Sequence, residues 1–275
     1  MQLVLGDRRY DLTSRSLVMG ILNRTPDSFY DRGAHWDLDR FFRLAEEHVT
    51  SGADILDVGG VKAGPGPDVD EAEELDRVVP AIEALHARFD VALSVDTWRA
   101  GVAEAAYAVG AVVGNDISGF ADDRYLPAAA AAGATVVATH IRTRPRVADP
   151  EPHYDDVVDD VSAFLLERAQ RAESAGIPRE RIVLDAGLDL GKTWQQSLTL
   201  LRASDRLAAL GHPVLLSASN KTFLGRLLDL EIDERRLASH AAHALGIRLG
   251  CRILRAHDVR GARRVADVCA AMLEA

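Results

Sequence analysis

Short apolar runs recur along the chain and alternate with longer amphipathic stretches. The runs are rich in Val, Ile, Leu and Ala and have the length of buried strands. They cover eight segments, residues 17–22, 55–58, 92–95, 112–114, 135–138, 182–184, 214–216 and 253–254. The stretches between them repeat their apolar positions at about 3.6 residues, the period of a helix. This pattern is clearest at residues 38–51, 69–88, 161–175 and 198–210.

Regular alternation of strands and helices predicts a parallel sheet with right-handed crossovers. Strands that are apolar throughout are covered on both faces, and eight such units favour closure into a (β/α)₈ TIM barrel over an open doubly wound sheet. Residues 3–10 are interpreted as a hairpin that covers the barrel floor. Because no low-complexity linker interrupts the pattern, we expect residues 1–275 to form a single α/β barrel domain.

Composition narrows the class of protein. The chain has a formal net charge of −10 and contains no long basic run that would neutralise a row of phosphates, so we expect no nucleic-acid partner. No apolar run approaches the roughly 20 residues of a membrane span, so no membrane partner is expected. The N-terminus lacks the profile of a signal peptide, and the cysteines are Cys251 and Cys269 alone. These features predict a cytoplasmic protein of a reducing compartment.

Polar residues follow several of the predicted strands directly. They include Asn23, Asp96, Asn115, Asp185, Lys221, Arg255 and His257. In a TIM barrel the carboxyl ends of the strands meet at one mouth, where the binding site lies. We therefore expect these side chains to line one small-molecule pocket.

The acidic residues of this set have two interpretations. Asp96 and Asp185 each precede a helical stretch, so either carboxylate could cap a helix N-terminus. Alternatively, the two carboxylates and the Asn115 amide face one cavity and hold a flat heterocycle, because a carboxylate accepts two parallel hydrogen bonds from adjacent N–H groups. A guanine-like or pterin-like edge has that donor pattern.

The cationic residues predict an anionic group on the ligand. Lys221, Arg255 and His257 would converge on it, although an ion-pair ring with the acids is the structural alternative. Asn23 could place its amide oxygen on a Mg²⁺ ion while the cations hold a pyrophosphate. Residues 187–193, GLDLGKT, lack the first glycine and the spacing of a P-loop, so we reject a nucleotide-binding P-loop.

Longer motifs carry a family resemblance. The segments MGILNRTPDSFYDRG, DVGG, SVDT, NDISG, LDAGLDLGKT and LRAHDV resemble those of dihydropteroate synthase, and the likeness spans nearly the whole chain. The family joins 6-hydroxymethyl-7,8-dihydropterin pyrophosphate to p-aminobenzoate and releases pyrophosphate. The resemblance implies that the pterin is held by Asp96, Asn115, Asp185 and Lys221. It implies that Arg255, His257 and Asn23 hold the pyrophosphate with its Mg²⁺.

The resemblance also implies how the reaction proceeds. The C–O bond breaks first, and the amine attacks the cationic pterin methylene while positioned cations stabilise the departing pyrophosphate. Lys221, Arg255 and His257 would supply those charges, and Asp31 matches a second aspartate of the family's first loop, PDSFSDGG. Ser219 and the loops after the first two strands would enclose p-aminobenzoate.

The departures from the family pattern gather where the second substrate should lie. The family's GGESTRPG loop reads GGVKAGPG here, so Lys62, Ala63 and Gly64 replace Ser-Thr-Arg and the glutamate is Val61. Four further family residues are replaced. Leu190 stands where GFGKT has phenylalanine, and Asn220 stands where SRKSF has arginine. Thr139 replaces a methionine, and Arg24 replaces a valine. The pterin ligands persist, whereas the hydroxyl and guanidinium of the second loop are lost.

These departures leave three functions open. The pattern most resembles the divergent second paralogue that some bacteria carry beside a true synthase, which implies a pterin pyrophosphate-type pocket with weak or lost synthase activity. A working synthase that uses Arg24 and Lys62 as replacement cations is the alternative. A pterin-dependent methyltransferase is third, disfavoured because Arg255 and His257 are retained and no corrinoid domain is present.

Two further features concern the surface. The resemblance implies a homodimer formed through the last helices, including the Ala-rich residues 237–249, for which a buried barrel helix is the alternative. Arg142, Arg144 and Arg146 form a basic cluster that could guard the barrel mouth or lie on a solvated loop.

Overall fold

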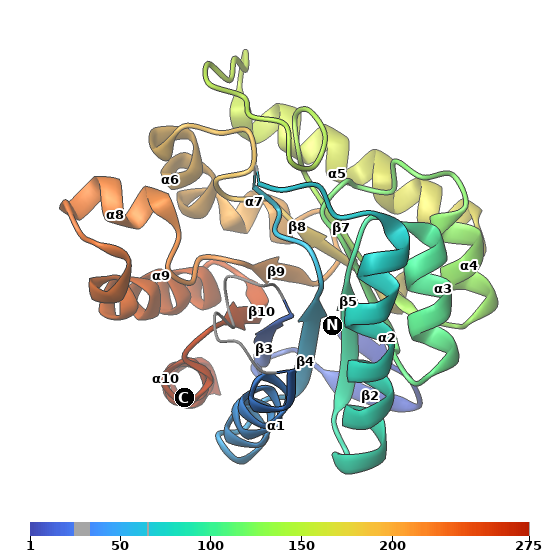
Figure 1. The fold of residues 1–275 in the computed structure, drawn as a ribbon. Coiled ribbons are helices and arrows are strands. Elements are labelled where there is room, and N and C mark those ends of the chain that lie inside the picture. The colour runs from blue at the N-terminus through green and yellow to red at the C-terminus, as the bar shows by residue number, and fades with distance from the viewer. Residues whose placement is uncertain (25–33, 65, 275) are drawn as a thin grey trace.

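A closed barrel of eight parallel strands forms the centre of the computed structural model (Figure 1). The structure describes residues 1–24, 34–64 and 66–274, with the side chains of residues 34–37 excepted. The barrel strands are β3 (Leu17–Asn23), β4 (Ile55–Gly59), β5 (Ala92–Asp96), β6 (Val113–Asp116), β7 (Thr135–Thr139), β8 (Ile182–Asp185), β9 (Val214–Leu216) and β10 (Cys251–Ala256). They pair in chain order, and β10 closes the ring by pairing with both β9 and β3. The predicted TIM barrel and all eight predicted strands are confirmed.

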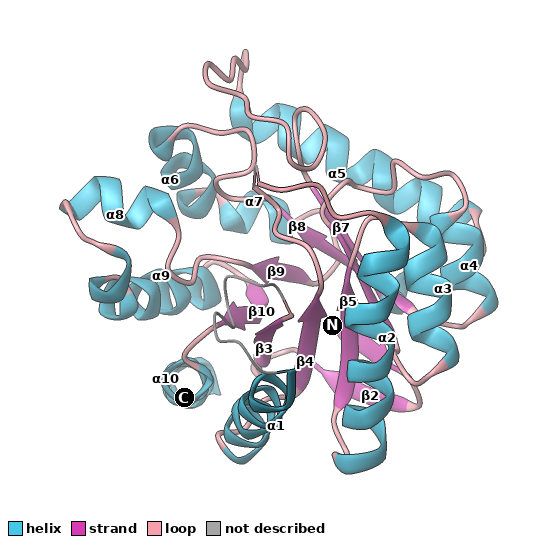
Figure 2. Cartoon of the chain, viewed as in Figure 1, coloured by secondary structure: helices cyan, strands magenta, loops and turns pink. Residues whose placement is uncertain are grey.

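Helices surround the strands on the outside of the barrel (Figure 2). They are α1 (Ala34–Thr50), α2 (Glu71–Arg88), α3 (Ala100–Ala108), α4 (Tyr125–Ala131), α5 (Val157–Ser174), α6 (Trp194–Arg202), α7 (Ser204–Ala208), α8 (Thr222–Leu228), α9 (Arg236–Arg248) and α10 (Val259–Glu274), with short 3₁₀ turns η2 (Arg179–Arg181) and η3 (Ile232–Glu234). In the described part of the chain, none of the helices has the length and apolar character needed to cross a membrane.

The segment predicted as one helix over residues 198–210 is two helices. Ala203 lies between α6 and α7 with φ −102° and ψ 20°, outside the helical region. Ser204 follows it and donates its hydroxyl to the Leu201 carbonyl oxygen (2.8 Å), which closes the turn. The apolar spacing continues through this break because both helices pack against the same core, so the sequence pattern did not reveal it.

The N-terminal segment closes one end of the barrel, as predicted. Strands β1 (Gln2–Leu5) and β2 (Arg8–Asp11) form an antiparallel hairpin. Leu3 and Leu5 pack with inward-facing residues of the barrel strands, among them Met19 and Ile55, in one buried cluster. The Thr135 hydroxyl donates to the Val4 carbonyl oxygen and ties the hairpin to β7. With this end filled by apolar side chains, the polar residues at the carboxyl ends of the strands mark the other end.

Candidate functional site at the barrel mouth

A buried acid at the centre of the mouth organises its neighbours. Asp57, on β4, is fully buried and accepts hydrogen bonds from three side chains. Its Oδ2 lies 2.7 Å from Arg255 Nε and 3.0 Å from Asn115 Nδ2, and its Oδ1 accepts from Ser94 Oγ (2.6 Å). Asp57 thereby fixes the direction of the Arg255 guanidinium and of the Asn115 amide.

Sequence reasoning missed Asp57. The residue lies inside the strand ILDVG, whereas the predicted site residues were sought after the strands. Asp57 could have been recognised as a site residue because it is a charged residue within an otherwise apolar strand, and a buried carboxylate requires polar partners. Asp57 points into the barrel and reaches Arg255 from a strand that is 198 residues away along the chain.

Arg255 joins a second carboxylate to this group. Its Nη2 lies 2.7 Å from Asp96 Oδ2, so one guanidinium bridges Asp57 and Asp96. Burial raises the pKa of Asp96, with Arg255 opposing the shift and Asp57 adding to it, and the resulting pKa is about 7. One connected group is therefore formed by the predicted ligands Asp96, Asn115 and Arg255. The ion pairs that were predicted as the alternative to ligand binding are part of this group.

Neither predicted acid caps a helix. Helix α3 begins after Arg99 rather than Asp96, and Thr193 is the N-cap of α6. Asp185 instead accepts a hydrogen bond at Oδ1 from the Gly187 backbone N–H (2.8 Å) and is buried. Burial raises the pKa of its carboxyl group, with Gly187 and Lys221 opposing the shift. The N-cap interpretation of both residues was wrong, because the strands lead into loops before the helices start.

Lys221 lies where these charges meet. Its Nζ donates to the Leu188 carbonyl oxygen (3.1 Å). Burial lowers the pKa of Lys221, while Asp189 and Asp185 raise it and Arg255 lowers it further. Lys221 is therefore a predicted cation that is held by a loop carbonyl oxygen and influenced by Asp189, Asp185 and Arg255.

Ser219 and His257 form a pair at the edge of the mouth. Ser219 Oγ lies 3.0 Å from His257 Nδ1 and accepts from the His257 backbone N–H (3.1 Å). Desolvation, together with the nearby Arg255 and Lys221, lowers the pKa of His257 to about 4. At neutral pH the imidazole is uncharged, so the positive charge of the predicted cation set comes from Arg255 and Lys221.

Asn23 ends β3 close to the acids. It pairs across the sheet with Gly59, which pairs in turn with Asp96. A Cβ atom on Gly59 would lie 3.5 Å from Asp96 Oδ2 and 3.7 Å from Asn23 Oδ1, so the glycine leaves space between the amide and the carboxylate. Asp31, the remaining predicted catalytic residue, lies outside the described residues.

The donors fit a Mg²⁺ ion only in part. Within residues 1–24, 34–64 and 66–274, no group of three or more His, Cys, Asp and Glu side chains is arranged to hold a metal. Mg²⁺ is commonly bound by one or two protein oxygens together with waters and substrate phosphates. The Asn23 amide oxygen suits such a site, in which most ligands come from the substrate and water.

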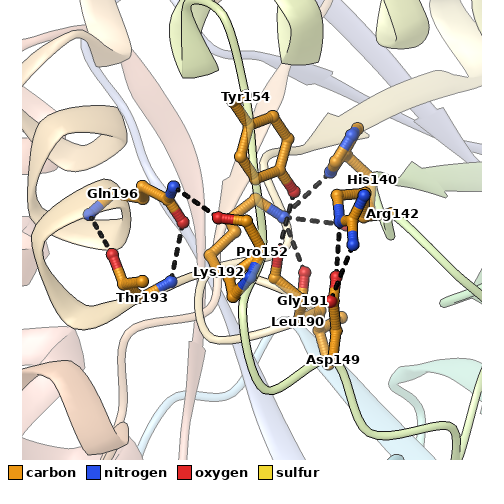
Figure 3. A network of polar contacts seen from close by, with 10 residues as sticks. All are labelled: His140, Arg142, Asp149, Pro152, Tyr154, Leu190, Gly191, Lys192, Thr193 and Gln196. Carbon is orange, nitrogen blue, oxygen red and sulfur yellow. Dashed lines mark hydrogen bonds and ion pairs between the residues drawn. The ribbon is translucent and has the colours of Figure 1, made fainter.

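The loop between β8 and α6 is held by a buried lysine that sequence reasoning did not select (Figure 3). Lys192 Nζ lies 2.9 Å from each of the Gly187 and Leu190 carbonyl oxygens and from His140 Nδ1. Burial lowers the pKa of Lys192 to about 7, and burial with the nearby Lys192 lowers that of His140 to about 3. The lysine of the GLDLGKT segment thus binds its own loop, in line with rejection of a P-loop.

The basic cluster after β7 contacts the second loop. The Arg146 backbone N–H donates to the Ala63 carbonyl oxygen (3.0 Å), and its Nη2 donates to the carbonyl oxygens of Gly66 and Pro67 (2.5 Å each). Arg142 pairs with Asp149, as Figure 3 also shows. These two arginines lie on a loop, with Arg142 exposed, so the solvated-loop interpretation holds for Arg142, and both side chains are also tied to protein groups.

Comparisons with known proteins agree with this geometry. A family model described as pterin binding enzyme matches residues 19–257. The inactive dihydropteroate synthase 2 of Mycobacterium leprae is 44% identical over 264 residues, which cover 94% of this chain and 91% of that protein. The dihydropteroate synthase of Bacillus subtilis is 40% identical over 261 residues, which cover 94% of this chain and 89% of that protein.

Solved structures match the whole barrel. The Yersinia pestis dihydropteroate synthase, solved with a sulfonamide drug, has a TM-score of 0.93 at 37% identity and covers 100% of both chains. The Xanthomonas albilineans dihydropteroate synthase, solved with 4-aminobenzoic acid, has a TM-score of 0.92 at 38% identity and covers 100% of this chain and 98% of that one. By its motifs, its barrel and these relatives, the chain belongs to the pterin-binding dihydropteroate synthase family.

Proposed function

We propose that this protein binds a pterin pyrophosphate-type ligand at the barrel mouth and that its synthase activity is weak or lost. One observation carries the proposal. The inner group of Asp57, Asp96, Asn115 and Arg255 is assembled and mutually hydrogen-bonded, whereas the second loop lacks the hydroxyl and guanidinium of the family pattern. The inner group that would bind the pterin is thus retained, whereas the second loop lacks the side chains expected to close over the second substrate.

The inner acids suit the flat edge of a pterin. Asp185 and Asp96 carry carboxylates that can accept paired N–H groups, and the Asn115 amide supplies a donor and an acceptor. Lys221 would donate to a ring oxygen or nitrogen from the Asp185 side. Because Asp57 already holds Asn115 and Arg255 in place, ligand binding would cost little further side-chain conformational entropy.

The pyrophosphate end would lie toward Arg255, His257 and Asn23. Arg255 is fixed by two carboxylates and presents its remaining N–H groups, while the uncharged His257 can donate one hydrogen bond. A Mg²⁺ ion bound there would neutralise phosphate charge. In a synthase reaction the C–O electron pair leaves with the pyrophosphate, and the amine nitrogen bonds to the pterin methylene and loses a proton. Residues of the mouth position the two partners, and none acts as a nucleophile.

The altered loops support the loss of activity. Residues 61–64 read VKAG, so the second loop offers neither the hydroxyl nor the arginine of the family motif. Arg146 holds the same loop by its backbone at Ala63, Gly66 and Pro67. The name of the Mycobacterium leprae relative, an inactive dihydropteroate synthase 2, agrees with this proposal.

A working synthase is the second candidate. Its support is the Bacillus subtilis dihydropteroate synthase, which at 40% identity is nearly as similar as the inactive relative. Arg24 would be a replacement cation at the end of β3, where its guanidinium lies 5.6 Å from the centroid of the Phe41 ring. Lys62 would be the other, on the second loop.

Calorimetry separates these functions. Dihydropterin pyrophosphate is titrated into the protein with Mg²⁺, p-aminobenzoate is then added, and pyrophosphate release is followed in the same sample. We expect pterin binding with slow or absent release, and an Asp96→Ala variant should lose the binding. Release at the rate of an active synthase measured in parallel would establish the second candidate, and absence of binding would reject the pterin pocket.

We also propose a cytoplasmic homodimer in which residues 1–275 act as one domain. Large apolar side chains are exposed on the last elements, with Leu237 80%, Met272 73% and Ile232 63% exposed. Burial of such residues is a common basis of association. Sedimentation equilibrium should show a dimer that Leu237→Glu weakens about tenfold or more, and a monomeric wild type would reject this part of the proposal.

A further inference from the structure

A carboxylate from the β8–α6 loop lies against the first turn of α8. Asp189 Oδ2 accepts hydrogen bonds from the backbone N–H groups of Thr222 (2.5 Å) and Phe223 (3.3 Å). Lys221 precedes α8 and makes no capping hydrogen bond with its own side chain. Asp189 therefore supplies, from a different loop, the acceptor that an N-cap residue usually supplies.

The backbone at Asp189 has a conformation that favours glycine. Its φ is +66°, in the left-handed region that non-glycine residues adopt less readily. Residues 189–193 read DLGKT where the family run is GFGKT, so an aspartate occupies the glycine position. The chain keeps the glycine-like backbone and adds a carboxylate, whose hydrogen bonds to α8 offset the strain.

The carboxylate is held in place from several sides. Lys192 Nζ binds the carbonyl oxygens of Gly187 and Leu190, which flank Asp189 in the chain, and Figure 3 shows the lysine head group within this loop. Ser197 Oγ accepts from the Asp189 backbone N–H (3.1 Å) and lies 3.3 Å from Oδ1. Asp189 is thus a fixed negative charge and not a freely rotating surface side chain.

This charge acts on the mouth through Lys221. Burial lowers the pKa of Lys221, while the nearby Asp189 and Asp185 carboxylates oppose the shift. Lys221 also donates to the carbonyl oxygen of Leu188, the residue before Asp189. Lys221 and the first backbone N–H groups of α8 therefore already interact with a carboxylate of the protein itself.

We propose that Asp189 determines the specificity for the second substrate by excluding an amine that bears a carboxylate. The inference rests on the proposed function and on the family resemblance, which implies that the second substrate lies near Ser219 and the replaced residues Leu190 and Asn220. A carboxylate such as that of p-aminobenzoate would meet a fixed like charge and N–H groups that are already bonded. An uncharged aromatic amine of the same shape avoids the repulsion between like charges, so it is the class of ligand that this side accepts.

The test compares p-aminobenzoate with its uncharged analogue p-aminobenzamide. Ligand-observed NMR titration gives the Kd of each on the wild type, Asp189→Gly, Asp189→Asn and Asp229→Asn, with and without dihydropterin pyrophosphate and Mg²⁺. Asp189→Asn keeps an acceptor for α8 and tolerates the backbone conformation, so it isolates the charge. Asp229 is a matched control, an exposed aspartate with φ +55° at the other end of α8.

We expect the wild type to bind the amide about tenfold more tightly than the acid. Both Asp189 variants should lose this preference, and Asp229→Asn should keep it. Equal Kd values in the wild type, an unchanged ratio in both Asp189 variants, or no binding of either compound to any of the proteins would overturn the proposal. Calorimetry with the pterin alone tests the proposed function separately. The ratio of the two Kd values measured without pterin tests the role of Asp189 whether or not the pterin binds.

Discussion

The inner part of the mouth and its rim differ in how their polar groups are paired. Inside, Asp57, Asp96, Asn115 and Arg255 bond to one another through side chains that come from four different strands. At the rim, Arg146 and Lys192 bond chiefly to backbone carbonyl oxygens of loops. The hydrogen bonds of the inner group depend on the identity of each residue, whereas those of the rim depend on the shape of the loops. Substitutions in the rim can therefore change the preference for the second substrate without disturbing the inner site.

The largest expected effect comes from removing the acid that organises the inner group. Asp57→Ala leaves Arg255 and Asn115 without their shared acceptor in a buried place, which should lower the free energy of unfolding by about 3 kcal/mol or more. Pterin affinity should fall about 100-fold, because Asn115 and Arg255 lose their fixed directions. Urea unfolding and calorimetry measure the two quantities.

Asp54→Ala is the control for Asp57. Asp54 precedes β4 at the other end of the barrel and, whereas Asp57 pairs with one arginine, it pairs with two, Arg15 and Arg263. Its loss should lower stability and leave pterin affinity unchanged in the folded protein. Pterin affinity that is equally insensitive to both substitutions would show that the inner group does not organise the site.

An intermediate effect is expected from pH. The folded protein holds the pKa of Asp96 at about 7 rather than the usual 3.8, mainly by burial, so the folded state retains a proton that the unfolded state loses. Asp96 should therefore lower the free energy of unfolding as pH rises from about 4 to 7. A protonated carboxyl group cannot accept paired N–H donors, so pterin affinity should rise about tenfold between about pH 6 and pH 8.

Calorimetry across that pH range checks the prediction for Asp96. An Asp96→Asn variant should bind more weakly throughout and lose most of the pH dependence. A wild-type affinity that stays flat with pH would show that Asp96 is ionised in the folded protein throughout this range and that the pairing with Arg255 outweighs burial.

The smallest effect is expected at the rim. Arg146→Ala removes side-chain hydrogen bonds to Gly66 and Pro67, and should destabilise the second loop locally by about 1 kcal/mol. Hydrogen exchange of residues 61–68 should become faster while pterin affinity stays unchanged. The neighbouring exposed Arg144, substituted by Ala, serves as the control. Equal exchange rates in both variants would show that the loop does not depend on Arg146.

Much of the fold could be predicted from the sequence, because apolar runs and amphipathic stretches encode burial directly. All eight strands and the N-terminal hairpin were predicted, since continuous apolar strands need cover on both faces. The division of residues 198–210 into α6 and α7 was missed, because the break at Ala203 does not disturb the apolar spacing.

The candidate site was predicted in outline for a topological reason. Residues such as Asp96 and Asn115 follow parallel strands, and a barrel brings the carboxyl ends of all its strands together. The sequence did not reveal Asp57, whose role depends on partners from β6 and β10. Nor did it reveal Asp189, whose position resembles an ordinary loop until α8 is placed against it.

By itself, the sequence determined the barrel and the set of polar residues at its mouth, because both follow from the local order and spacing of residues, while the resemblance to the family identified the altered second loop. Only the tertiary structure decided which of those groups touch and what charge they carry. His257 is uncharged because of desolvation and its neighbours Arg255 and Lys221, and the pKa of Asp96 is raised to about 7 mainly because its carboxyl group is buried. Such shifts depend on solvent exclusion and on distances between strands far apart in the chain, quantities that exist only once the barrel has closed.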